Sequence, residues 1–276
     1  MLVGFLLLPL PRAQAVDAPE LDAGFRLLYQ LNFSEARAQF ALWQKAHPDD
    51  PLGDASEAAS YLFEELYHQG VFTSEFFLDD KKLLGGVAGK PDEKHRAGFT
   101  AANQRAQALA RQRLKANSKD ADALFALTIS IGMQADYASL IEKRHFEGLR
   151  LIREADGRAK TLLALRPGAD DAYLALGAGN YIIGCLPGHE RFFLFFAGIH
   201  GDRSAGMRQL QRAAEGGHYL RPFAKMMLAL AALREKQVPV ARKQLEELVA
   251  EFPQNPLFAR ELAKLKKPAA RQASSP

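Results

Sequence analysis

The stretch LNFSEARAQFALWQKAHPDDP, residues 31–51, contains a residue spacing that recurs along the chain. Its landmark positions are Ala36, Phe40, Trp43 and Pro48, separated by four, three and five residues. On an α-helix, offsets of four and three place side chains on one face, and a small first residue lets a neighbouring helix approach closely. Proline ends such a helix, because it lacks a backbone N–H and disfavours helical backbone in the residue before it. The stretch therefore predicts a helix that packs through one face and ends before Pro48.

Four further copies of this spacing follow, some with substitutions at the landmark positions. They are Ala106, Ala110, Arg113 and Ser118; Ala155, Ala159, Leu162 and Pro167; Gly206, Leu210, Ala213 and His218; and Ala241, Leu245, Leu248 and Pro253. An apolar helical pattern precedes each copy, with small residues at close-packing positions that include Gly24, Ala58, Gly177 and Ala229. We therefore expect an all-α fold made of consecutive helix pairs.

This pattern resembles the tetratricopeptide repeat, a helix-turn-helix unit of 34 residues. The resemblance rests on the small residues above, on the second-helix alanines Ala36 and Ala241, and on the terminal prolines Pro48, Pro167 and Pro253. The segment from Tyr173 onward is similar to a divergent branch of the family, found in exported bacterial proteins, with an insert ahead of a Gly-Asp-Arg-x-x-Gly turn. The residues that match are Gly201, Asp202, Arg203, Gly206 and Leu210. The resemblance implies an α-solenoid whose concave surface is lined by the first helix of each pair.

Two insertions interrupt the repeat, each between the first and second helix of a pair. They cover about residues 71–99 and 185–200, and a helical extension covers about 136–149. The expected solenoid spans residues 16–266, and the remaining residues, 267–276, are expected to form a disordered tail.

The N-terminus resembles a signal peptide. An apolar run from Leu2 to Leu10 precedes Ala13-Gln14-Ala15, the small-x-small pattern at which signal peptidase cleaves. No Lys or Arg precedes the run, and a buried first helix is the alternative interpretation. We expect residues 1–15 to be removed, so that the mature chain begins at Val16 and is exported, in a bacterium to the periplasm.

Charge and cysteine content narrow the function classes. The 36 basic and 32 acidic residues leave a net charge of +4, and no basic run alternates with aromatic residues. This distribution argues against nucleic acid as a partner. Cys185 is the only cysteine, so an intramolecular disulfide is excluded, and its apolar neighbours favour a buried thiol over a reactive one.

The resemblance favours binding of a protein or peptide on the concave surface, without catalysis and without a cofactor. The residues expected on that surface are Phe25, Ala55, Ala59, Leu62, Phe125, Ile129, Leu174, Ala178 and Tyr181. Because they are apolar, either the groove binds an apolar ligand or the two insertions fold into it and fill it.

Two Glu-x-x-His motifs raise an enzymatic alternative, a metal-dependent helical oxidoreductase of the di-iron type. Glu65 and His68, and likewise Glu142 and His145, lie one helical turn apart, as in the di-iron sites of four-helix bundles. Such a site needs two more carboxylates, for which Glu57 or Glu64 and Glu147 or Glu154 are the candidates. Charged neighbours place both histidines on solvated faces instead, and no other catalytic motif is present.

The second insertion contains RFFLFFAGIH, residues 191–200, with Phe192, Phe193, Phe195 and Phe196 within five positions. We expect a short helix buried against the solenoid, because an exposed aromatic patch of this size invites aggregation. Phe72, Phe76 and Phe77 of the first insertion lead to the same expectation. The alternative for the aromatic insertion is contact with a membrane surface, as in an envelope assembly factor.

Overall fold

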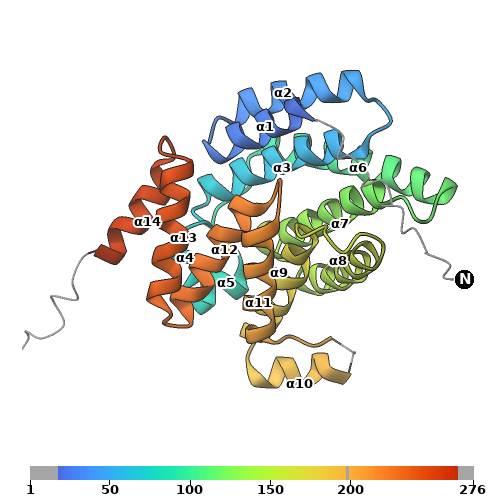
Figure 1. Ribbon diagram of the computed structural model, residues 1–276. Coiled ribbons are helices and arrows are strands. Elements are labelled where there is room, and N and C mark those ends of the chain that lie inside the picture. The colour runs from blue at the N-terminus through green and yellow to red at the C-terminus, as the bar shows by residue number, and fades with distance from the viewer. Residues whose placement is uncertain (1–17, 197–198, 267–276) are drawn as a thin grey trace, which may run out of the picture.

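The computed structural model describes residues 18–196 and 199–266, and this part of the chain is all-helical (Figure 1). It contains fourteen α-helices, one π-helical segment and no strand. The all-α prediction is therefore confirmed for the described residues. The predicted signal peptide, residues 1–15, and the predicted tail, residues 267–276, lie outside them.

Ten of these helices form five consecutive pairs. The pairs are α1 (Pro19–Tyr29) with α2 (Phe33–Ala46), α3 (Pro51–His68) with α6 (Glu93–Ala116), α7 (Ala121–Asp136) with α8 (His145–Leu165), α9 (Ala172–Cys185) with α11 (Arg203–Gly216), and α12 (Arg221–Arg234) with α13 (Val238–Glu251). The second helix of each pair also packs on the first helix of the next pair, and α14 (Pro256–Lys266) packs on α13.

The landmark spacing marks the second helix of each pair. Helices α2, α8 and α13 each end two residues before the landmark proline, at Ala46, Leu165 and Glu251. Ala36 and Phe40 are fully buried, and a Cβ on Gly24 of α1 would collide with the Phe40 ring. A residue without a side chain is therefore needed at Gly24, because α1 and α2 approach closely there.

The first insertion is shorter than expected. It contains α4 (Ser74–Phe77) and α5 (Asp80–Gly85), and α6 already begins at Glu93 rather than after residue 99. The earlier start has a local cause, since the Asp92 carboxylate accepts hydrogen bonds from the backbone N–H groups of Lys94 and His95 and so caps the helix. The phenylalanines of this insertion are buried as predicted; they are Phe72, Phe76 and Phe77.

The expected extension, about residues 136–149, is divided between two elements. A π-helical segment, η1 (Tyr137–Ile141), continues α7 directly, and α8 already begins at His145. The stretch Ala121–Ile141 is long and apolar enough to cross a bilayer. It nevertheless packs on α3, α6, α8 and α9, and 56% of its apolar window is buried, as in the core helix of a globular domain.

The expectation of a buried aromatic insertion is wrong. Helix α10 (Gly188–Phe196) lies beyond the end of the α9–α11 pair, apart from the other helices (Figure 1). The side chains of Phe192, Phe195 and Phe196 are 60%, 61% and 72% exposed.

The first and last helix pairs meet. Tyr29 Oη of α1 donates a hydrogen bond to the backbone oxygen of Tyr219 (2.9 Å), and Asn255 Nδ2 donates one to the backbone oxygen of Tyr29 (2.7 Å). The rings of Phe25 and Tyr219 stack with centroids 4.8 Å apart. The succession of pairs thus curves until its two ends share one core.

Candidate functional site

Most of the nine residues predicted on the concave surface are buried within the protein. Five of them are buried, and the prediction that they face a partner is corrected for these five: Phe25, Ala55, Leu62, Leu174 and Tyr181. The other four are half-buried: Ala59, Phe125, Ile129 and Ala178.

The chain itself covers this surface. Phe25 packs on Tyr219 near the start of α12. Tyr181 Oη donates to the backbone oxygen of Ala231 in α12 (3.2 Å), and the Tyr181 ring stacks on Phe77 of the first insertion (6.1 Å between centroids). The last helix pair and the first insertion therefore occupy the space that a ligand would need.

A polar groove lies instead along α6, where α6 meets the end of α7 and η1. We call it the α6 groove, and its pocket has a volume of about 550 Å³. Its lining residues are Arg96, Phe99, Thr100, Asn103, Gln104, Gln107, Ala108, Arg111, Gln134, Tyr137, Glu142 and Arg144.

Two polar side chains in this lining have unpaired atoms. Asn103 and Tyr137 are 4% and 5% exposed, and neither Asn103 Oδ1 nor Tyr137 Oη has a hydrogen-bond partner among the described residues. Leaving a buried polar atom unpaired costs about 1–3 kcal/mol, so a partner for either atom would be stabilising. Both atoms are closed off from solvent, so a ligand in the groove reaches them only after a local side-chain movement. Burial raises the pKa of Tyr137 to about 12, so its hydroxyl keeps the proton that it would donate.

Local backbone geometry places Tyr137 there. The Glu142 N–H donates to the Tyr137 carbonyl (3.1 Å), a bond over five residues that defines the π-helical turn. The first insertion holds this turn, because Val87 N–H donates to the Leu140 carbonyl (2.9 Å). Phe99 of α6 stacks on the Tyr137 ring with centroids 4.7 Å apart and fixes its orientation.

The walls of the groove carry both signs of charge. Arg111 lies 3.6 Å from a carboxylate oxygen of Glu154, and Arg144 pairs with Glu142 and Glu147. Gln107 Nε2 donates to Gln134 Oε1 (2.8 Å), which joins α6 to α7 beside the floor. The groove therefore presents both hydrogen-bond donors and hydrogen-bond acceptors. It suits a polar ligand that also carries donors and acceptors better than it suits a simple anion.

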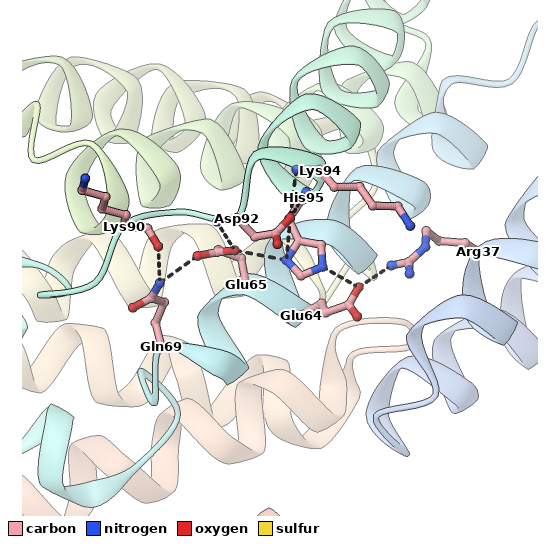
Figure 2. A network of polar contacts seen from close by, with 8 residues as sticks. All are labelled: Arg37, Glu64, Glu65, Gln69, Lys90, Asp92, Lys94 and His95. Carbon is pink, nitrogen blue, oxygen red and sulfur yellow. Dashed lines mark hydrogen bonds and ion pairs between the residues drawn. The ribbon is translucent and has the colours of Figure 1, made fainter.

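A charged network joins the start of α6 to α3, next to the groove (Figure 2). Glu65 of α3 is 2% exposed, and its carboxylate accepts from Gln69 Nε2 (2.9 Å) and from the backbone N–H of Asp92 (3.2 Å). His95 lies between two carboxylates, with Nδ1 3.1 Å from Glu65 Oε2 and Nε2 3.4 Å from Glu64 Oε2. The network fixes the end of α6 on which the groove is built.

The two Glu-x-x-His motifs are not brought together. Among the described residues, no three His, Cys, Asp or Glu side chains are placed to hold a metal ion. The oxygens of Glu65 are engaged by Gln69, Asp92 and His95, and Glu142 pairs with Arg144. The predicted solvation of the histidines is confirmed, since His68 and His145 are exposed, whereas Glu65 of the first motif is buried. These residues do not fit the di-iron alternative.

Cys185 is half-buried at the end of α9, beside Tyr181 and Arg234. Burial raises the pKa of its thiol, and this disfavours the reactive thiolate.

No family model matches the chain, and no curated protein matches it. Sequence reasoning missed Asn103 and Tyr137, although one signal for Asn103 was available. It lies beside Ala102 and one turn before Ala106, on the buried face of α6, where a polar side chain is unusual. Tyr137 had no such signal, because its position depends on the π-helical turn.

Proposed function

We propose that this protein is an exported helical-repeat protein of tetratricopeptide type that binds a segment of another protein and catalyses no reaction. The succession of five helix pairs supports the repeat assignment, as do the recurring helix ends and the close packing of Gly24 on Phe40. Export rests on the pattern of residues 1–15, and N-terminal sequencing of the native protein is expected to begin at Val16. An intact Met1 would refute export.

The binding site we propose is the α6 groove rather than the concave surface. The observation that carries this proposal is the pair of unpaired buried atoms, Asn103 Oδ1 and Tyr137 Oη. A peptide group supplies the complement of both once these side chains turn toward the groove, because its N–H can donate to Asn103 and its carbonyl can accept from Tyr137. The side-chain amides of Gln104, Gln107 and Gln134 extend the same chemistry along the groove.

The lining also supports a binding role over a catalytic one. It includes no histidine, cysteine or serine, and its one carboxylate, Glu142, is paired with Arg144. Its arginines and Glu142 lie at the walls, where they can pair with oppositely charged side chains of the bound segment.

Selection from a random peptide library tests this proposal on the purified protein. Peptides that bind the wild type are expected to bind Tyr137→Phe about two- to tenfold more weakly in calorimetry, the range for one hydrogen bond. The same variant is expected to melt at an equal or higher temperature, because it removes an unpaired buried hydroxyl. This combination separates a ligand-binding hydroxyl from a structural one.

The matched control is Gln112→Ala, an exposed residue of α6 outside the groove, which is expected to bind the selected peptides as the wild type does. Unchanged affinity in Tyr137→Phe, or a lower melting temperature, would refute the assignment of Tyr137 to the binding site.

A further inference from the structure

Helix α10 carries a cluster of exposed aromatic rings. Phe192, Phe195 and Phe196 are spaced by three and one residues, so they share one face of the helix. Their rings contact one another, with centroids 5.0 Å apart for Phe192–Phe196 and 5.9 Å for Phe195–Phe196. Leu194, on the opposite face, is half-buried, which indicates that the aromatic face points away from the body of the protein.

The base of this segment is held firmly. Helices α9 and α11 approach so closely that a Cβ on Gly177 would meet the backbone of Leu210, and one on Gly206 would meet that of Tyr181. At the end of the pair, a Cβ on Gly201 would collide with the backbone of Gly184. Gly184 and Gly201, which flank the insertion, therefore lie close together at the end of the α9–α11 pair. Figure 1 shows α10 projecting from the other helices beyond this point.

The size of the aromatic face disfavours a second copy of this chain as its partner. Three phenylalanines exposed to this degree present about 400 Å² of ring surface. Two such faces together would bury about 800 Å², below the roughly 1,200 Å² of a specific protein interface. An exposed apolar patch of several hundred Å² on a protein of this size nevertheless calls for a functional explanation.

We propose that α10 inserts its phenylalanine face into the interfacial region of a lipid bilayer and so holds the protein at a membrane surface. A bilayer accepts a projecting, convex aromatic face and needs no matching groove. Nine residues span about 14 Å, too short to cross the hydrocarbon core, so the helix lies in the interface. Arg191 precedes Phe192, and the His200 ring lies 5.0 Å from the Phe195 ring; both residues are exposed and can contact the headgroups.

Vesicle binding by the full chain tests this proposal, independently of the α6 groove. In flotation with phosphatidylcholine vesicles containing phosphatidylglycerol, the double variant Phe195→Ala/Phe196→Ala is expected to partition at least about tenfold more weakly than the wild type. The matched control is Phe146→Ala, because Phe146 is 90% exposed but stands alone at the start of α8. It is expected to partition as the wild type does. Circular dichroism is expected to give the same melting temperature for all three proteins, since the substituted rings are exposed.

A fluorescence measurement reports on α10 alone. The chain has a single tryptophan, Trp43, which is 4% exposed in α2, so Phe195→Trp introduces one new solvent-exposed reporter. Its emission is expected to shift to shorter wavelength on addition of vesicles, whereas Phe146→Trp is expected to show no shift. The measurement is repeated with vesicles of phosphatidylcholine alone, which carry no anionic headgroups. If the rings insert into the bilayer, the emission shifts with both kinds of vesicle, whereas attraction by anionic headgroups alone gives no shift with phosphatidylcholine.

Absence of the shift in both lipids would overturn the proposal, as would equal partitioning of the double variant and the wild type. A dimer in sedimentation equilibrium that is lost in the double variant would assign the aromatic face to a second copy and would overturn it too.

Discussion

Glu65 is a buried carboxylate whose partners were not apparent from sequence. From the motif alone, replacing Glu65 and His68 together should change stability by about 1 kcal/mol or less, as for surface residues. In the structure the two residues differ, because Glu65 accepts hydrogen bonds from Gln69 and from the Asp92 backbone, whereas His68 is exposed.

We therefore expect Glu65→Gln to lower the free energy of unfolding by about 1–3 kcal/mol, because it leaves a donor facing Asp92 N–H or His95. His68→Ala, on the same helix, is the control and should change it by less than about 0.5 kcal/mol. Urea denaturation of both variants measures the difference, and equal stabilities would contradict the role assigned to the network.

Asp136 makes stability depend on pH. Burial raises its pKa in the folded protein to about 7, whereas an Asp in the unfolded chain titrates near 3.9. Between these values the folded state keeps a proton that the unfolded state releases, so the contribution of Asp136 to stability falls as pH rises from about 4 to about 7.

Asp136→Asn removes this titration. Relative to the wild type, the variant should gain about 1–4 kcal/mol of unfolding free energy between pH 4 and pH 8. Chemical denaturation of both proteins at the two pH values measures this gain. A stability difference that does not change with pH would show that Asp136 has an ordinary pKa.

At the scale of the helix, the landmark alanine reports on packing. Ala36 is fully buried in α2, whereas Ala41 of the same helix is exposed. Ala36→Leu should overpack the helix interface and lower the free energy of unfolding by about 1–3 kcal/mol. Ala41→Leu should be nearly silent, and since leucine and alanine have similar helix propensity, packing alone separates the two. Equal melting temperatures would show that the spacing does not mark a helix interface.

The helices themselves were largely predictable, because each depends on local signals. The landmark spacing located the second helices, and the prolines located three of their ends. The start of α6 was also available locally, in the capping residue Asp92, but the length assigned to the insertion hid it. The π-helical turn was not predictable, because it depends on a contact between Val87 and Leu140, more than fifty residues apart.

Exposure of α10 was not predictable either. Its composition favours burial, and the prediction failed because close packing of glycines at the end of the α9–α11 pair fixes where the insertion begins and ends. From these ends α10 extends beyond the other helices.

At the scale of the whole molecule, an open concave surface and a filled one could not be distinguished from sequence. Apolar residues such as Phe25 and Tyr181 are compatible with a ligand or with the chain itself. The outcome depends on contacts between residues about 190 positions apart, such as Tyr29 with Tyr219. Because the chain fills this surface, we place the binding function on the α6 groove, where Asn103 and Tyr137 retain unpaired atoms.

Photo-crosslinking in living cells of the source organism tests that placement most directly. The exposed groove residue Gln104 is replaced by p-benzoylphenylalanine, and Gln112, exposed on α6 outside the groove, is replaced in a control strain. We expect a discrete protein adduct from position 104 that is absent from position 112 and weakened by Asn103→Ala. No adduct at position 104, or the same adduct from both positions, would contradict the claim that this protein binds its partner in the α6 groove.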